Sequence, residues 1–292
     1  MPQRANRRFG TIAVVLSIGV LVAAVSCDGG AETPDGPSIP RRIVAIGDSI
    51  TLATNACCLP GNQPTASWSV GGGEDDAVTS HLERLAGAAG AHRIRAFNVA
   101  RPGATVADAL RQAEAAVRRR ADYVTVLLGA NDACRSPMTP VDVFEERFGA
   151  AIDALGTGLP RARVLVASVP NVVRLWGLFR DDPTARTIWR TFGTCPSVLA
   201  ETTTPVERNA VLERIRAYNA VLRRTCADHP RCRFDRGAVF RYAFARDEVS
   251  ALDRFHPSVD GQAALARLTW SRSWWASLGP AWRAAAGTPG RR

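Results

Sequence analysis

Lysine is absent from this sequence of 292 residues, so all 37 of its basic side chains are arginine and the formal net charge is +10. The arginines are scattered, and they neither form a long run nor alternate with a stripe of aromatic residues. A nucleic-acid site gathers its positive charge on one face, so this distribution indicates a solvated surface and no nucleic-acid partner. Weak attraction to anionic lipid headgroups is the alternative. The codon usage of a GC-rich genome is sufficient to explain the choice of arginine.

Patterns that bind metal ions are also missing. The chain contains no C-x-x-C pair and only four histidines, and these do not cluster. Structural zinc sites need such groups, so we expect neither a metal nor another cofactor. His81, His92 and His229 lie in an early helical pattern, a strand pattern and a cysteine-flanked turn. Packing or surface roles are expected for all three.

The first 27 residues have the pattern of an export signal. Three arginines precede an apolar run over residues 9–25, and small residues then lead to Cys27. This arrangement predicts a signal segment over 1–27. It resembles a bacterial lipoprotein signal with Cys27 as the lipidated residue, although Ala24 stands where such signals usually carry Leu or Val. Cleavage with free secretion and retention as an N-terminal anchor remain alternatives. We expect export in each case, and membrane association if Cys27 is lipidated.

The remaining chain is predicted to form one domain. Residues 28–40 are rich in Gly, Pro, Asp and Ser, which is typical of a flexible tether. Residues 41–280 carry the apolar patterns of a globular core, and 281–292 form a C-terminal tail. We find no internal repeat and no second domain, and we expect a monomer.

An even number of cysteines, six, lies within the predicted domain. In an exported protein this number predicts disulfides. Two cysteines six residues apart are close enough to bridge around a turn, and a second bridge would tie a long connection to the third strand's loop. The pairing that we expect joins Cys226 to Cys232 and Cys134 to Cys195, which leaves Cys57 and Cys58 as a vicinal pair or in another of the fifteen patterns.

Strand and helix patterns alternate through the domain. Short apolar runs predict strands at 41–46, 92–99, 123–128, 163–169 and 231–234. Helical periodicity covers 78–85, 106–119, 141–155, 205–226 and 258–278. This alternation predicts an α/β fold with a parallel sheet and helices on both of its faces. Residues 171–204 read as a long mixed connection with a functional or covering role.

Three segments carry hydrogen-bonding groups at the ends of predicted strands or at the start of a helix, where parallel sheets bind their ligands. Gly47-Asp48-Ser49-Ile50 sets a serine hydroxyl at the carboxyl end of the first strand, where Gly47 permits a tight turn. The alternative is that Asp48 and Ser49 only cap a helix. Gly103 precedes a helix, so its N–H is suited to developing negative charge, and Asn131 ends the third strand.

His256 differs from the other histidines because Asp253 stands three residues before it in a loop. A carboxylate in that position fixes the imidazole tautomer and stabilises the imidazolium. The loop follows the last strand, which places it at the same sheet edge as Ser49. A serine needs a base to take its proton, so the sequence predicts that His256 activates Ser49.

The four segments, in this order, resemble the SGNH (GDSL-type) hydrolase superfamily, with Ile50 where Leu is usual. The resemblance implies a three-layer α/β/α flavodoxin-like fold with a central parallel sheet of about five strands, and ester hydrolysis without a metal. It implies that Ser49 is the nucleophile, that His256 is the base and then the acid, and that Asp253 orients it. The oxyanion hole would comprise the N–H groups of Ser49 and Gly103 and the Asn131 amide.

Within the superfamily, the segment 67–72, the cysteine after Asn131 and Phe255-His256-Pro257 look like phospholipase B-like members and secreted actinobacterial lipase-esterases. This resemblance implies a small-molecule or lipid ester substrate, such as a lysophospholipid. A polysaccharide deacetylase is the alternative. A non-catalytic lipid- or glycan-binding lipoprotein is disfavoured, because every residue of the implied site is intact.

Apolar residues near the predicted site are candidates for an acyl groove. They lie in the loop over 51–73 and in the connection over 171–196, where polar residues are expected. Half of them are expected to cover the core instead. The candidates are Leu52, Leu59, Trp68, Val172, Leu175, Trp176, Leu178 and Phe179.

Overall fold

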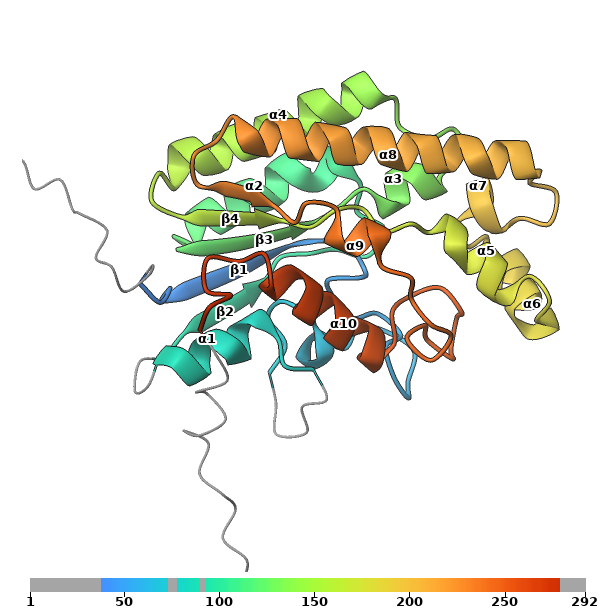
Figure 1. Ribbon diagram of the computed structural model, residues 1–292, viewed down its shortest axis with the longest axis horizontal. Coiled ribbons are helices and arrows are strands. Elements are labelled where there is room, and N and C mark those ends of the chain that lie inside the picture. Colours follow the sequence, from blue (N-terminus) through green and yellow to red (C-terminus); the bar gives the residue numbers. More distant parts are fainter. Residues whose placement is uncertain (1–37, 73–77, 90–92, 279–292) are drawn as a thin grey trace, which may run out of the picture. The chain divides into compact units, whose positions relative to one another are not determined.

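The computed structural model describes residues 38–72, 78–89 and 93–278. The five strands in these ranges form one parallel sheet (Figure 1). The strand order is β2-β1-β3-β4-β5, which is the order of flavodoxin-like folds. The predicted fold class is therefore confirmed. Strand bounds are β1 Arg42–Gly47, β2 Arg95–Asn98, β3 Tyr123–Leu127, β4 Arg163–Val166 and β5 Cys232–Phe234.

Helices cover both faces of the sheet and complete the three layers (Figure 1). One face carries α2 (Ala109–Arg118), α4 (Val141–Gly158) and α8 (Pro205–Ala227), and the other carries α1 (His81–Ala89) and α10 (Val259–Trp270). Short elements lie in the connections, namely the 3-10 helices η1 (Pro64–Ala66) and η2 (Val106–Asp108) and the helices α3 (Ala130–Cys134) and α9 (Ala238–Arg241).

Alternating side chains of the buried strands supply two separate cores. Val44 and Val124 point into the larger core, together with residues of α2, α4 and α8. Their strand neighbours Ile43 and Tyr123 belong to the smaller core on the opposite face, where Trp270 joins them. This arrangement explains why the strands read as continuous apolar runs, since both faces are buried.

His81 lies in the smaller core, where it is fully buried. Thr269 Oγ1 donates to the Leu265 carbonyl, so it accepts from His81 Nε2, 2.8 Å away. His81 Nδ1 then accepts from the Tyr123 hydroxyl at 2.9 Å. Burial lowers the pKa of His81 to about 3, so the ring is neutral, and the predicted packing role is confirmed.

This buried ring makes stability depend on pH in a predictable direction. Below pH 6.5 the unfolded chain protonates His81, whereas the folded chain does so near pH 3. The unfolded state therefore binds more protons in this window, and the free energy of unfolding falls by about 1.4 kcal/mol per pH unit as the pH drops. We expect His81→Gln to remove that slope in urea unfolding between pH 6.5 and 4.5. Equal slopes in both proteins would show that His81 is charged in the folded state.

The connection over 171–204 is helical, which the sequence analysis did not predict. It contains α5 (Val173–Phe179), α6 (Pro183–Phe192) and α7 (Pro196–Leu199). Asp182 caps α6 by accepting from the N–H groups of Thr184 and Ala185, and Gly193 ends the helix with a positive φ. The predicted helix over 258–278 is too long, because the chain turns after Trp270 and Trp275 packs against Tyr123.

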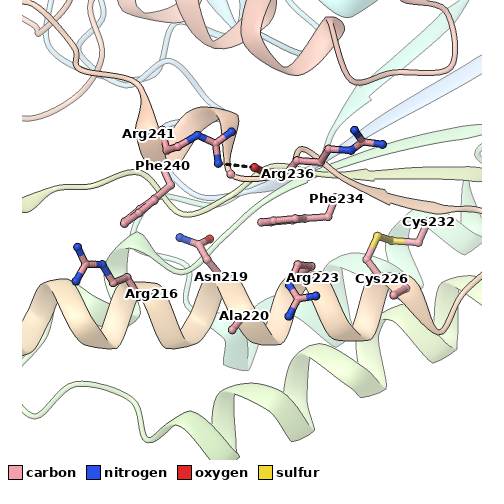
Figure 2. A pocket seen from close by; sticks show the side chains of 12 residues that line it. Arg216, Asn219, Ala220, Arg223, Cys226, Cys232, Phe234, Arg236, Phe240 and Arg241 are labelled. Carbon is pink, nitrogen blue, oxygen red and sulfur yellow. Dashed lines mark hydrogen bonds between the residues drawn. A yellow bond between two sulfur atoms is a disulfide. The ribbon is translucent and has the colours of Figure 1, made fainter.

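The described residues contain three disulfides, of which two link separate elements of the fold. Cys226–Cys232 joins the end of α8 to β5 (Figure 2), and Cys134–Cys195 joins the end of α3 to the start of α7. Cys57 and Cys58 form the vicinal pair. The two bridges that the sequence predicted are present, and the structure resolves the open alternative for Cys57 and Cys58 as the vicinal pair.

Several sequence predictions fall outside the described residues. These are the signal segment 1–27 with Cys27, most of the tether 28–40, His92 and the tail 281–292. Among the helices that the structure describes, none has the length and apolar character to span a membrane.

Candidate active site

Ser49, His256 and Asp253 form a continuous hydrogen-bonded chain at the carboxyl edge of the sheet. His256 Nε2 lies 2.8 Å from Ser49 Oγ, and Nδ1 lies 2.6 Å from Asp253 Oδ2. Both the imidazole and the carboxylate are 14% exposed, so solvent reaches the site while each group stays fixed. The structure brings together all three residues that the sequence analysis proposed as catalytic.

The turn that carries Ser49 is held from two sides. Gln112 of α2 accepts from the Gly47 N–H at 2.8 Å and donates to the Gly47 carbonyl at 3.0 Å. Gln262 of α10 donates to the Ile50 carbonyl at 2.8 Å. A Cβ on Gly47 would lie 2.2 Å from the Thr51 hydroxyl, so glycine is needed for close approach. The sequence analysis assigned this glycine to backbone freedom instead.

Asp253 is fixed through both of its carboxylate oxygens. Oδ1 accepts from the N–H groups of Phe255 and His256 at 2.9 and 3.0 Å. Oδ2 accepts from His256 and from the Asn55 amide at 2.6 Å. Burial acts to raise the pKa of Asp253, but these hydrogen bonds outweigh burial and hold the pKa below its usual value. Asp253 is therefore a carboxylate at neutral pH.

Asn55 was not singled out by the sequence analysis. Its Oδ1 accepts from the Gly61 N–H at 2.8 Å, and Gly61 O accepts from the Asn55 N–H at 2.8 Å. Ser250 Oγ also donates to the Asn55 carbonyl, which joins this loop to the segment that carries Asp253. An asparagine in a turn is a common residue with positive φ, so nothing local marks this contact across 198 residues.

The Asn131 amide lies between the segments that carry the other two expected oxyanion donors, the N–H groups of Ser49 and Gly103. Across the described part of the chain, the N–H groups of Ser49 and Gly103 have no protein acceptor. Asn131 Nδ2 donates to the Ala104 carbonyl at 2.9 Å and approaches Asp48 Oδ2 at 3.4 Å. Gly103 has a φ of +72°, which favours glycine and turns the chain toward η2.

Two buried carboxyl groups brace these donors. Burial raises the pKa of Asp48 to about 7, although the Ile50 N–H and the nearby His256 act to lower it. Asp132 accepts from the Val106 N–H at 2.9 Å and from the Thr139 hydroxyl at 2.8 Å. It thereby joins the Asn131 segment to the segment after Gly103, a role that the sequence analysis did not assign.

A narrow apolar pocket opens beside this arrangement. Ile50, which follows Ser49, and Phe255, which precedes His256, both line it. Its free volume is about 50 Å³, room for roughly three to five water-sized groups. Of the eight proposed acyl-groove residues, Val172, Leu175 and Leu178 line this pocket.

The other five proposed groove residues lie elsewhere. Trp68 and Phe179 are buried in the core, and Leu59 is 73% exposed. Trp176 packs under the Arg208 guanidinium, and Leu52 is outside the pocket. The groove hypothesis expected about half of the eight residues to cover the core, as Trp68 and Phe179 do. The exposed position of Leu59 is the clear departure from it, because sequence position does not show where a side chain points.

A family model described as the GDSL-like Lipase/Acylhydrolase family matches residues 45–264. The chain belongs to this family. Its members are carboxylic ester hydrolases, and the matched range contains Ser49, Asn131, Asp253 and His256. The predicted superfamily is thus confirmed.

Known proteins of this family and fold resemble the chain. It is 29% identical over 223 residues to membrane-associated phospholipase B1 of Rattus norvegicus, a match that covers 62% of this chain and 15% of that protein. An α/β hydrolase from the metagenome of Lake Arreo, Spain, has a TM-score of 0.51 and 20% identity, covering 80% of this chain and 94% of that one. The lipase/acylhydrolase of Enterococcus faecalis has a TM-score of 0.50 and 21% identity, covering 78% and 92%.

Proposed function

We propose that this protein is a serine esterase that cleaves acyl esters of lipids or lysophospholipids, with Ser49 as its nucleophile. The observation that carries this proposal is the contact of His256 Nε2 with Ser49 Oγ at 2.8 Å, beside an apolar pocket that starts at Ile50. The similarity to phospholipase B1 supports a lipid ester as substrate.

The first half of the reaction forms an acyl-enzyme. Ser49 Oγ attacks the ester carbonyl carbon while His256 Nε2 takes its proton, and the Asp253 carboxylate stabilises the resulting imidazolium. The C–O bond to the alcohol then breaks, and His256 gives the proton to the leaving oxygen. In the second half, water attacks the acyl carbon and transfers its proton through His256 to Ser49 Oγ, which releases the acid.

Negative charge on the carbonyl oxygen is stabilised by the three donors near Ser49. The N–H groups of Ser49 and Gly103 have no competing acceptor among the described residues. Asn131 Nδ2 exchanges its longer contact, the 3.4 Å one to Asp48, for the oxyanion and keeps its bond to Ala104. Donors fixed in this way need little reorganisation, which is why such sites lower the barrier by several kcal/mol.

The pocket favours a substrate with an apolar acyl chain and one polar group that can bind the Asn171 amide. Its walls include Val172, Leu175 and Leu178, whereas Asn171 supplies an amide. Asn171 Oδ1 is buried and has no hydrogen-bond partner in the described part of the chain. A buried polar atom without a partner is costly, so we infer that a substrate group such as a free hydroxyl binds this amide.

Acyl-chain preference follows from the pocket. Each buried methylene contributes about 0.8 kcal/mol, so we expect kcat/KM to rise about tenfold from acetyl to butanoyl p-nitrophenyl esters. Hexanoyl esters should be cleaved at least as well as butanoyl esters. Hydrolysis that is fastest with acetyl and nearly absent with hexanoyl would instead favour the polysaccharide deacetylase.

Two variants test whether the acyl-chain preference comes from this pocket. Leu178→Arg brings a charge to the pocket wall, so butanoyl hydrolysis should fall about tenfold while acetyl hydrolysis changes less than threefold. Leu59→Arg is the matched control, because Leu59 is 73% exposed and outside the pocket. The pocket assignment fails if both variants lose butanoyl hydrolysis equally.

Asn55 is a positioning residue for Asp253 in this mechanism. In Asn55→Asp the new carboxyl group can donate to Asp253 Oδ2 only while protonated, and once it ionises the two carboxylates repel. We expect its kcat to fall with rising pH where the wild type shows no fall, with KM unchanged. Asn55→Ala should lose about tenfold in kcat at every pH, since one charge-assisted hydrogen bond is lost.

The control for Asn55→Asp is Asn62→Asp in the same loop, where Asn62 bonds Thr54 and not Asp253. Rates are measured over pH 5 to 9. Identical pH profiles for Asn55→Asp and the wild type would exclude the positioning role.

We further propose that the protein is exported and held at the membrane through a lipid on Cys27, or secreted after cleavage. The three disulfides support export, because such bonds persist in oxidising compartments. A monomeric state remains a prediction. Lipid attachment is tested by the mass of the mature N-terminal peptide, where an unmodified residue 27 excludes the lipid anchor.

A further inference from the structure

A second hollow lies at the outer edge of the sheet, away from the residues of the acyl pocket. It is a groove between α8 and the segment 232–241, which carries β5 and α9 (Figure 2). Strand β5 is the edge strand next to β4. The groove has a volume of about 590 Å³ and shares no lining residue with the acyl pocket. It is therefore a separate candidate site.

The floor of this groove is apolar. Phe234 and Phe240 are half-buried against the main core, and both rings lie in the groove (Figure 2). The Cys226–Cys232 disulfide closes one end. Apolar surface that stays in contact with water is unfavourable, so a ligand with an apolar body gains free energy by covering it.

The rim carries positive charge without an acidic lining residue. Arg216 and Arg223 of α8 line one side of the groove, and Arg236 and Arg241 line the other (Figure 2). Arg216 is paired with Glu213, and Arg241 donates to the Arg236 carbonyl at 2.7 Å. Neither Arg223 nor Arg236 has an acidic side chain within salt-bridge distance in the ranges that the structure covers.

Positive charge is also concentrated around the neighbouring Arg233. Burial lowers the pKa of Arg233, and the positive charges of Arg163 and Arg236 lower it further. Arg236 thus stands in a region where guanidinium groups repel one another.

We propose that this groove binds one fatty-acid anion. Its carboxylate binds at the arginine rim, to which Arg223 and Arg236 contribute, and its chain covers Phe234 and Phe240. An inorganic anion would leave the aromatic floor in water, and a neutral lipid would leave the two arginines uncompensated. A single-chain anionic amphiphile satisfies both parts, and guanidinium groups match carboxylate geometry. Hydrolysis by the proposed esterase releases an acid of this class, but the groove needs no catalysis to bind it.

Calorimetric titration of the full chain with dodecanoate, below the concentration at which it forms micelles, tests the proposal. The Ser49→Ala protein is used so that no acyl transfer occurs. Adding Arg223→Ala and Arg236→Ala together should weaken binding at least tenfold. Adding Arg224→Ala should change it less than twofold, because Arg224 lies next to Arg223 but pairs with Glu145 outside the groove. Leu178→Arg, which alters the acyl pocket, should leave this binding in place.

The comparison ligands separate the alternatives. Dodecyl maltoside has the same chain and a neutral head, so it should bind at least tenfold more weakly than dodecanoate. Equal binding of both ligands, or equal binding by the double arginine variant and its Arg224→Ala control, would overturn the proposal. Binding to vesicles of anionic phospholipid without binding of dodecanoate would also overturn it, and would assign the groove to a membrane surface.

Discussion

Ser49→Ala lowers kcat/KM for carboxylic esters by about 10⁴-fold or more in the mechanism proposed above. Without Ser49 Oγ no acyl-enzyme forms, and water must attack the bound ester directly. His256 Nε2 also loses its partner at 2.8 Å, but no buried group becomes unsatisfied at the solvent-reached site. The variant should therefore fold normally while the oxyanion donors retain a small residual rate.

Steady-state hydrolysis of p-nitrophenyl butanoate measures this loss, and circular dichroism confirms the fold. Ser271→Ala is the matched control, because Ser271 is exposed at the end of α10 and its hydroxyl donates to the Leu268 carbonyl and not to a site residue. A Ser49→Ala protein that keeps more than a tenth of the wild-type rate would remove Ser49 from the mechanism.

Asp253→Asn is expected to lower kcat by about 10⁴-fold, with little change in KM. The carboxylate fixes the His256 tautomer by accepting from Nδ1 at 2.6 Å, which leaves Nε2 free to accept the Ser49 proton. An amide at the same place can donate to Nδ1, and the imidazole then carries its proton on the wrong nitrogen. The substrate pocket is unchanged, so binding of the ester should persist.

The control for this variant is Asp247→Asn, which changes an exposed acid of the same loop region. Both proteins are compared in kcat and KM on one butanoyl ester. If Asp253→Asn stays within tenfold of the wild type, Asp253 does not orient His256.

The main features of the site were predictable because they are local in the sequence. Ser49, Gly103 and Asn131 follow strands or precede helices, and parallel strands bring their carboxyl ends to one edge. Asp253 and His256 lie three residues apart, so a single turn joins them. Continuous apolar runs likewise revealed the buried strands, since β1 and β3 are buried on both faces.

The supporting residues were not predictable, since their contacts cross the fold. Asn55 bonds Asp253 across 198 residues, and Gln262 bonds Ile50 across 212. Glutamine and asparagine are common on protein surfaces, so no sequence pattern shows that Asn55 and Gln262 point into the fold. Helices α5, α6 and α7 were missed because their apolar runs are short, although Asp182-Pro183 and Gly193 carry the start and stop signals of α6.

The central claim, that Ser49 attacks the ester under activation by His256, is tested most directly by mapping a covalent adduct. The purified chain is treated with an alkyl fluorophosphonate, and intact mass and peptide mass spectra are recorded as esterase activity falls. We expect one adduct per chain, on the peptide that contains Ser49, with activity lost in proportion to labelling and no adduct in Ser49→Ala. Complete inactivation with Ser49 unlabelled, or labelling of another residue in parallel with inactivation, would contradict the mechanism.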